Sequence, residues 1–204
     1  MRARGEGASE AMKRWGVFLD RDGVINEEVG YLDNPAALKL IPGAAHAIRC
    51  LNRVHIPVIV VTNQAGVARG YFTEQRVHEI HEALSRLLAA EGAHIDRYYY
   101  CPHHPAEGLD PYRLDCECRK PKPGMLLKAA EEFNLDLKRC YFIGDKDLDI
   151  ETGWRAGTHT ILVLTGYGEE MWRNWPHIFK PDHVARNLQE AVEWILEVEG
   201  LPLL

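Results

Sequence analysis

The sequence lacks long apolar runs, has no excess of basic residues and contains few cysteines. No stretch approaches the roughly 18 consecutive apolar residues of a membrane span, so no membrane partner is expected. The net charge of -6 argues against a general nucleic-acid binder, because such proteins carry a basic excess. The segment Met1–Gly7 is basic but no apolar segment follows it, so a signal peptide is not expected. Residues 1–14 are predicted to form a loose tail.

The five cysteines are odd in number and unevenly spaced. Three of them, Cys101, Cys116 and Cys118, lie close together, which favours reduced thiols around a metal over a disulfide framework. Reduced thiols indicate a cytoplasmic protein. Hydrophobic residues make up 46% of the chain and charged residues 26%, which is enough for one full core. A single domain is therefore expected over residues 15–204.

The most informative stretch is Val17–Leu19 followed by Asp20-Arg21-Asp22-Gly23. The apolar run is short and predicts a buried strand, after which Gly23 can turn the chain. Open parallel sheets place ligand sites at the carboxyl ends of their strands. Two carboxylates two residues apart repel unless a cation or a proton lies between them. Asp20 and Asp22 can therefore hold Mg²⁺ or divide the roles of nucleophile and acid/base, and a solvated turn is the alternative.

Apolar strands and amphipathic helices alternate along the rest of the chain, which indicates an α/β fold with a parallel sheet. Further strands are predicted at residues 57–61, 95–100, 140–144, 161–166 and 183–185, and helices after Gly43, Thr73, Pro123 and Asn187. Residues 27–35 have no period and predict a loop. His78 and His81, on the second helix, are predicted to be surface or boundary residues.

Polar residues follow two more of these strands. Thr62 and Asn63 can donate hydrogen bonds to a phosphoryl oxygen, although a polar turn is the ordinary alternative. Asp145 is the first polar residue after the fourth strand and can complete a Mg²⁺ site with Asp20. For Asp149, capping the next turn and orienting a ligand both stay open.

A second motif consists of Cys101 and His103, followed after a loop by Cys116 and Cys118. Three cysteines and one histidine form a structural zinc set, and the close pairs let each arm clamp the ion. His104 can replace His103 as the ligand. The alternatives are chance thiols, or a disulfide between Cys116 and Cys118 in a strained, very small ring.

Arg119 and Lys120 follow the second cysteine pair directly and precede the helix that begins at Pro123-Gly124. The clamp on one side and the helix on the other are expected to hold both side chains. A lysine can neutralise a transferring phosphoryl group, and an arginine can grip a second phosphate through a bidentate fork. A solvated basic turn is the alternative.

The order of these motifs, Asp-x-Asp, Thr, Lys and Gly-Asp, resembles the haloacid dehalogenase (HAD) superfamily of phosphotransferases. The resemblance implies a doubly wound (Rossmann-like) parallel sheet and a Mg²⁺-dependent phosphatase. It implies that Asp20 is the nucleophile that forms an aspartyl phosphate, and that Asp22 is the general acid and then the base. Thr62 and Lys120 would stabilise the phosphoryl oxygens. Asp145 would join Asp20 and the Asp22 carbonyl on Mg²⁺.

A closer resemblance is to the D-glycero-D-manno-heptose 1,7-bisphosphate 7-phosphatases, which act in the synthesis of lipopolysaccharide precursors. It is carried by Asn63-Gln64, the segment 66–70, the cysteine–histidine clamp and Arg119–Pro121. The segment between the two halves of the clamp, called the zinc arm, is long here, and a long arm is the form that the heptose enzymes have. The sister group, the histidinol-phosphate phosphatases, is the alternative. Ala65 departs from the serine of many relatives. The implied substrate-binding residues are Glu28, Val29, Gly30, Tyr31, Asn63, Gln64, Arg119 and Lys146.

The spacing of the motifs leaves no room for a separate cap domain, because helices, strands and loops use up residues 23–61 and 63–119. Selection of a small phosphorylated sugar must therefore come from the loops at 28–31 and 64–69 and from the zinc arm. A monomer is expected. Two other classes of protein are alternatives: a receiver domain, which would lack an acid placed like Asp22, and a zinc-dependent binding module, which would lack a catalytic residue.

Overall fold

The computed structural model describes residues 14–175 and 179–203. The predicted tail, apart from Arg14, lies outside the described residues. Arg14 donates its backbone N–H to the carbonyl of Asn134 and accepts from the N–H of Asp136. No helix among the described residues is long and apolar enough to cross a membrane.

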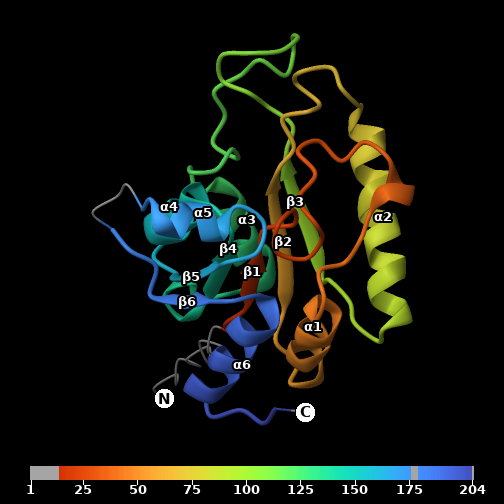
Figure 1. Ribbon diagram of the computed structural model, residues 1–204. Coiled ribbons are helices and arrows are strands. Elements are labelled where there is room, and N and C mark those ends of the chain that lie inside the picture. The colour runs from red at the N-terminus through yellow and green to blue at the C-terminus, as the bar shows by residue number, and fades with distance from the viewer. Residues whose placement is uncertain (1–13, 176–178, 204) are drawn as a thin grey trace, which may run out of the picture.

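A six-stranded parallel sheet forms the centre of the molecule, in the order β3-β2-β1-β4-β5-β6 (Figure 1). The strands are β1 (Val17–Leu19), β2 (Val58–Asn63), β3 (Arg97–Cys101), β4 (Tyr141–Gly144), β5 (His159–Val163) and β6 (His183–Ala185). The chain order reverses between β1 and β4, so their carboxyl ends form the switch point at which such sheets bind ligands. This arrangement confirms the predicted doubly wound α/β fold.

Helices cover both faces of the sheet: α1 packs against α6 and α3 packs against α4 (Figure 1). The helices are α1 (Ala44–Arg53), α2 (Glu74–Ala90), α3 (Gly124–Phe133), α4 (Asp147–Ala156), α5 (Gly168–Arg173) and α6 (Leu188–Val198). The predicted caps are confirmed, because the side chains of Thr73 and Asn187 accept hydrogen bonds from backbone N–H groups three residues on. Helix α5 was not predicted, since six residues are too short for an apolar period to be recognised.

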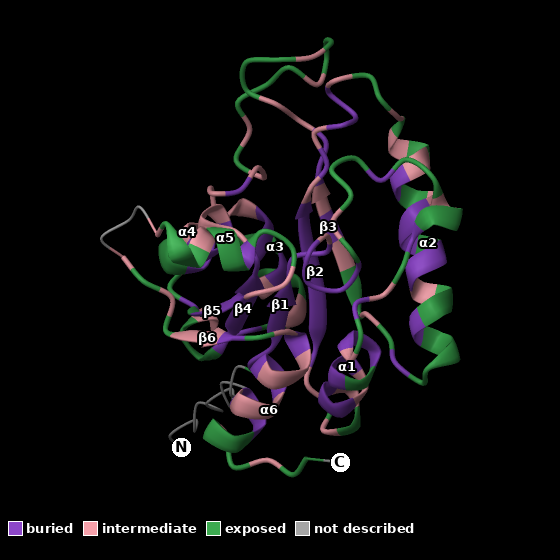
Figure 2. Ribbon diagram, viewed as in Figure 1, coloured by how far each residue is buried: buried purple, intermediate pink, exposed green. Residues whose placement is uncertain are grey.

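The connections between strands carry no second domain. One 3₁₀ turn (Pro35–Ala37) and α1 lie between β1 and β2, and α2 lies between β2 and β3. The central strands β2, β1, β4 and β5 are almost wholly buried, whereas the edge strands β3 and β6 are partly exposed, as is much of the loop length at the carboxyl ends (Figure 2). Selection of a substrate by these loops stays a prediction.

Thr62 and Asn63 lie at the carboxyl end of β2, as predicted, because pairing with Tyr100 and Cys101 of β3 continues to that point. One sequence prediction differs from the structure. His81 is buried, not a surface residue, and its ring stacks on Tyr98 with centroids 4.6 Å apart. Burial there lowers the pKa of His81 to about 3.

Candidate active site

Three buried carboxylates meet at the switch point of the sheet. Asp20 follows β1, Asp145 follows β4 and Asp149 lies in the first turn of α4. Each can place one ligand atom within 4.8 Å of the others. The backbone N–H of Asp20 donates to the carbonyl of Ile143, so the β1–β4 ladder itself brings the acids together.

Asp145 sits in a cradle made by two glycines. Gly23 and Gly166 both have positive φ, and a Cβ atom on either would lie 2.2 Å from Asp145 Oδ2, so only glycine fits. This oxygen accepts from the N–H of Tyr167 at 2.9 Å. The other oxygen, Oδ1, accepts no hydrogen bond from the described residues, and Lys146 Nζ lies 3.6 Å away.

Electrostatics at Asp145 also favour a bound cation. Burial raises the pKa of Asp145 to about 8, and although Lys146 opposes this, the carboxylates of Asp149 and Asp20 add to it. An oxygen-ligating divalent ion would replace this repulsion by attraction, because Mg²⁺ takes carboxylate oxygens. The residues therefore fit the Mg²⁺ site that the sequence predicted, with Asp149 added to the acidic group.

The ammonium of Lys120 is buried among these acids. Its Nζ lies 2.9 Å from Asp20 Oδ1, 2.7 Å from Asp149 Oδ1 and 3.1 Å from the carbonyl of Val61. Burial would lower the pKa of Lys120, but Asp149 and Asp20 outweigh burial and raise it, so the lysine is charged. Asp149 also accepts from the backbone N–H of Lys146, so it caps the first turn of α4. Its other oxygen contacts Lys120, and a role in orienting a ligand stays a prediction.

Asn63 lines the cavity and also fixes the backbone of Lys120. Its Oδ1 accepts from the Lys120 N–H at 3.1 Å, and its Nδ2 donates to the Lys120 carbonyl at 3.1 Å. The sequence predicted a substrate-binding residue here. The structure adds a positioning role that could not be read from the chain, because 57 residues separate the partners.

Asp22 is held by a fork from its neighbour. Arg21 Nη2 donates to both carboxylate oxygens, at 2.9 Å and 2.8 Å, and Asn26 and Gln64 donate to one oxygen each. Burial alone would raise the pKa of Asp22, but Arg21 and the two amides hold it below its usual value. Gln64 also donates to Thr62 Oγ1 at 2.9 Å. Sequence reasoning gave Arg21 and Asn26 no role, and the only signal was an arginine between two acids.

One cavity of about 320 Å³ collects most of the predicted residues. Those lining it are Asp20, Asp22, Glu28, Gly30, Tyr31, Thr62, Asn63, Gln64, Arg119, Lys120 and Lys146. Val29 is not among them and is 54% exposed, while Asp145 is fully buried. Ala65, Leu148 and Tyr167 also line the cavity, and of these only Ala65 had been singled out from the sequence.

Glu28 and Lys146 form an ion pair at the cavity. Lys146 Nζ lies 2.9 Å from Glu28 Oε2 and 4.8 Å from the ring centre of Tyr167. Burial alone would lower the pKa of Lys146. The carboxylates of Asp20, Asp145, Asp149 and Glu28 outweigh burial and raise this pKa, so the ammonium stays charged. A ligand phosphate or hydroxyl that enters here meets this pair rather than an isolated acid.

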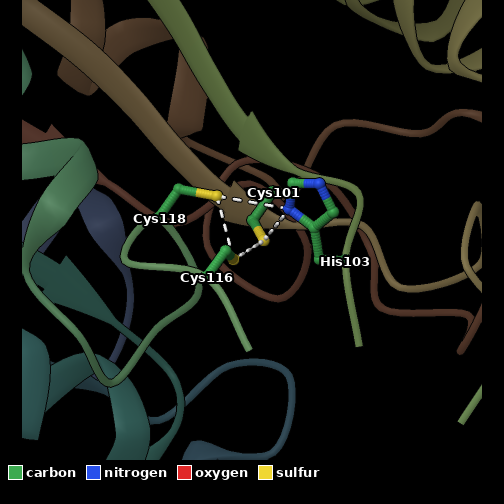
Figure 3. A group of neighbouring side chains, drawn as sticks. All are labelled: Cys101, His103, Cys116 and Cys118. Carbon is green, nitrogen blue, oxygen red and sulfur yellow. Dashed lines mark hydrogen bonds between the residues drawn. The ribbon is translucent and has the colours of Figure 1, made fainter. Parts of the chain in front are cut away.

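The predicted cysteine–histidine clamp comes together, with four side chains facing one point (Figure 3). The Sγ atoms of Cys101 and Cys118 lie 3.4 Å and 3.1 Å from Cys116 Sγ, and 3.6 Å and 3.5 Å from His103 Nδ1. Cys116 and Cys118 are not joined to each other, so the alternative of a disulfide between them is wrong. His104 accepts instead from the N–H groups of residues 106 and 107.

The clamp also fixes Arg119. This residue follows Cys118 directly, and its Nη1 donates to the carbonyl of His103 at 3.0 Å. The loop closes behind it, where the N–H of Gly124 donates to the carbonyl of Glu117. A Cβ on Gly124 would lie 2.3 Å from that carbonyl oxygen, so glycine is needed for this closure. The guanidinium is thus held at the cavity wall by both halves of the clamp, through the His103 carbonyl and through its neighbour Cys118.

Comparison with known proteins gives similarity along nearly the whole chain. Residues 117–191 match the family model described as HAD-hydrolase-like. A D-glycero-D-manno-heptose-1,7-bisphosphate 7-phosphatase of Thermosynechococcus vestitus is 44% identical and covers 90% of this chain and 96% of its own length. The D-glycero-beta-D-manno-heptose-1,7-bisphosphate 7-phosphatase of Escherichia coli is 37% identical, covering 88% of this chain and 87% of its own.

A solved structure gives the same result. The D,D-heptose 1,7-bisphosphate phosphatase of B. bronchiseptica, complexed with magnesium and phosphate, superimposes with a TM-score of 0.82 at 32% identity. The match covers 91% of this chain and 99% of that one.

The two roles of Asn63 can be separated by Asn63→Ala. Loss of two hydrogen bonds should lower the free energy of unfolding by about 1–3 kcal/mol. Because Lys120 then loses its backbone support, kcat for a phosphate monoester should fall while KM changes little. Chemical denaturation and steady-state kinetics measure both effects.

Asn52→Ala is the matched control, since Asn52 makes the same reciprocal pair with the backbone of His94, 42 residues away and outside the cavity lining. It should lose stability and keep kcat. A rise in KM with unchanged kcat for Asn63→Ala would instead mark Asn63 as a substrate ligand only.

Proposed function

Since this chain belongs to the family of D-glycero-D-manno-heptose-1,7-bisphosphate 7-phosphatases, we propose that it removes the 7-phosphate of a heptose bisphosphate. The chain is a HAD-like phosphatase, a phosphoric monoester hydrolase. The observation that carries the proposed mechanism is the convergence of Asp20, Asp22 and Lys120 in one cavity above buried Asp145. Membership of a phosphatase family decides against the receiver domain and the zinc-dependent binding module.

In the proposed first step, a carboxylate oxygen of Asp20 attacks phosphorus and the bond to the sugar oxygen breaks. The N–H of Arg21 donates to Asp20 Oδ1 at 2.8 Å, which together with Lys120 fixes the orientation of the nucleophile. Thr62 Oγ1 accepts from Gln64, so its own proton is free to be donated to a phosphoryl oxygen. Lys120 supplies positive charge next to the oxygens that gain negative charge.

Asp22 is proposed to move the protons. With its pKa held below the usual value, it is a base at neutral pH and can take a proton from the water that hydrolyses the aspartyl phosphate. As an acid in the first step it needs a proton first. A phosphate monoester, with a second pKa near 6, still carries one in part at neutral pH. Asp22 would receive that proton and pass it to the leaving sugar oxygen.

We propose that Asp145 and Asp20, with the main-chain carbonyl of Asp22, hold Mg²⁺. The Asp22 carboxylate is engaged by Arg21 and lies outside the acidic group, which suits the carbonyl as the ligand. The ion would neutralise charge on the phosphoryl group. Asp149 keeps Lys120 in place beside it.

The proposed roles of the two acids predict different losses. Asp20→Asn should abolish turnover while the fold survives, because a neutral amide cannot replace the carboxylate as the nucleophile. Asp22→Asn should cut the rate by about 10²–10⁴-fold, the usual contribution of general acid–base catalysis. Single-turnover kinetics and circular dichroism measure both. Near-normal turnover by Asp20→Asn would falsify this assignment.

We propose that the clamp binds one structural zinc ion. Four ligands around Zn²⁺ with a bond of about 2.3 Å place sulfurs about 3.8 Å apart. The Sγ–Sγ distances of 3.4 Å and 3.1 Å are shorter than this by less than 1 Å, so a small outward movement of the side chains would admit the ion. Hydrogen bonding from Cys101 lowers the pKa of Cys118 to about 5, which favours a thiolate ligand. With four ligands the site is closed, and its function would be to hold Arg119 and Lys120.

Metal analysis of purified protein should therefore find about one zinc per chain. Removal of zinc by a chelator should lower the melting temperature and lower activity, because Arg119 loses its support. Fully active, fully folded protein without zinc would rule out this role. Cys50→Ser should keep the same zinc content, since Cys50 is a buried cysteine outside the clamp.

Arg119 is proposed to bind the second phosphate of the substrate. Lys120 is engaged by Asp20 and Asp149, so it serves the phosphoryl group that is transferred. Arg119 lines the same cavity and uses one donor, Nη1, on the His103 carbonyl. The rest of its fork can grip a phosphate in a bidentate manner. Without a cap domain, this contact is a direct means of selecting a bisphosphate.

Arg119→Ala should cost about 1.5–3 kcal/mol on a heptose bisphosphate, or roughly 10–150-fold in kcat/KM. The loss on a simple monophosphate should be much smaller. Arg113→Ala is the matched control, because Arg113 lies on the same arm, pairs with Asp110 and does not line the cavity. Equal losses on both substrates, or faster turnover of histidinol phosphate, would favour the histidinol-phosphate alternative.

The cytoplasmic location and the monomeric state expected from the sequence stay predictions.

A further inference from the structure

The rim of the cavity contains an aromatic ring that has little core packing of its own. Tyr31 lines the cavity and is 45% exposed. The loop before it is tied at the backbone, because the N–H of Gly30 donates to Glu28 Oε1 at 2.7 Å. The ring itself is contacted by side chains of another segment.

Two side chains of the neighbouring loop at residues 64–72 contact this ring. Tyr71 meets Tyr31 edge to face, with centroids 4.8 Å apart, and the guanidinium carbon of Arg69 lies 6.0 Å from the Tyr31 ring centre. The second arrangement is a cation–π contact. The Arg69 side chain is 28% exposed, less than either tyrosine, so it is the most buried member of the three.

The same guanidinium also meets the zinc arm, the segment 104–115 between the two halves of the clamp. The guanidinium of Arg69 pairs with the carboxylate of Glu107. The backbones of the arm and the loop are also joined, because the N–H of Leu109 donates to the carbonyl of Ala68 at 2.8 Å. Gly108 passes so close that a Cβ there would lie 2.2 Å from the same carbonyl oxygen. The arm is thus docked on the loop, with Arg69 at the junction.

We propose that Arg69 is a positioning residue that links the zinc arm to Tyr31 and so sets the shape of the cavity rim. The ion pair with Glu107 fixes the guanidinium, and the guanidinium holds the ring at the point where the body of a sugar would pass. Arg69 then affects recognition of the part of the substrate beyond the transferred phosphate. The substrate part of this proposal rests on the proposed function.

The test combines kinetics with a measurement that needs no substrate. Arg69→Met should lower the ratio of kcat/KM for heptose bisphosphate to kcat/KM for acetyl phosphate by roughly 2–5-fold, the equivalent of one exposed cation–π contact. The change should lie in KM for the sugar. Arg69→Lys should recover part of the ratio, because a lysine keeps the cation but not the planar fork. Glu107→Gln, which removes the ion pair that fixes the guanidinium, should act in the same direction as Arg69→Met.

Hydrogen–deuterium exchange of the unliganded protein gives the second readout. Amides of residues 27–34 should exchange faster in Arg69→Met, by a similar roughly 2–5-fold, because the ring no longer anchors the loop. Arg76→Met is the matched control, since Arg76 is exposed on α2 and pairs with Glu79 away from the rim. It should change neither readout.

The outcomes separate the two proposals. A wild-type protein that hydrolyses acetyl phosphate but not heptose bisphosphate would refute the proposed substrate, and the exchange data would still decide the role of Arg69. If heptose bisphosphate is a substrate and Arg69→Met behaves like Arg76→Met in both measurements, Arg69 does not position the rim. Faster exchange with an unchanged substrate ratio would likewise overturn its role in selection.

Discussion

The ammonium of Lys120, buried between Asp20 and Asp149, is the interaction on which the site depends. Three carboxylates gathered without water would repel one another, and burial alone would protonate them. Lys120 neutralises part of the charge of Asp20 and Asp149 directly. The Oδ1 atom of Asp145 accepts no hydrogen bond from the described residues, so it can take a second cation. Removing one partner of such a buried pair typically costs about 3–5 kcal/mol, so catalysis and stability share these contacts.

This constraint explains why so much of the fold serves the backbone around Lys120. The lysine does not come from the strands that carry the acids, but from a loop after β3. Asn63 holds its peptide groups from β2, and the cysteine–histidine clamp holds the residue before it. A flexible loop would have to lose conformational entropy each time the lysine entered the acidic group. A preorganised loop has already lost that entropy on folding, which makes the charge effective in the transition state.

The sequence could predict the parts of the site that depend on local pattern. Acids directly after buried strands, and a clamp of close cysteine and histidine pairs, follow from period and spacing. It could not assign roles that depend on long-range contacts. The pairing of Asn63 with Lys120 and the burial of Arg21 beneath Asp22 need the folded chain, as does the pairing of Glu28 with Lys146. His81 was misjudged for the same reason, because a polar residue on an amphipathic helix can face a sheet edge.

The charges around the cavity suggest how an open site can be selective. At the phosphoryl end, Lys120 is already paired with Asp20 and Asp149, and Thr62 accepts from Gln64 and keeps one hydroxyl proton for a phosphoryl oxygen. At the other end, Lys146 is neutralised by Glu28 and Arg119 is held with part of its fork unused. An isolated phosphate therefore gains little beyond the catalytic centre. A ligand with a second anionic group gains a charge-assisted contact without having to break an existing ion pair, because Arg119 carries no carboxylate partner among the described residues. Selectivity then follows from which cations the protein has left without a counter-ion.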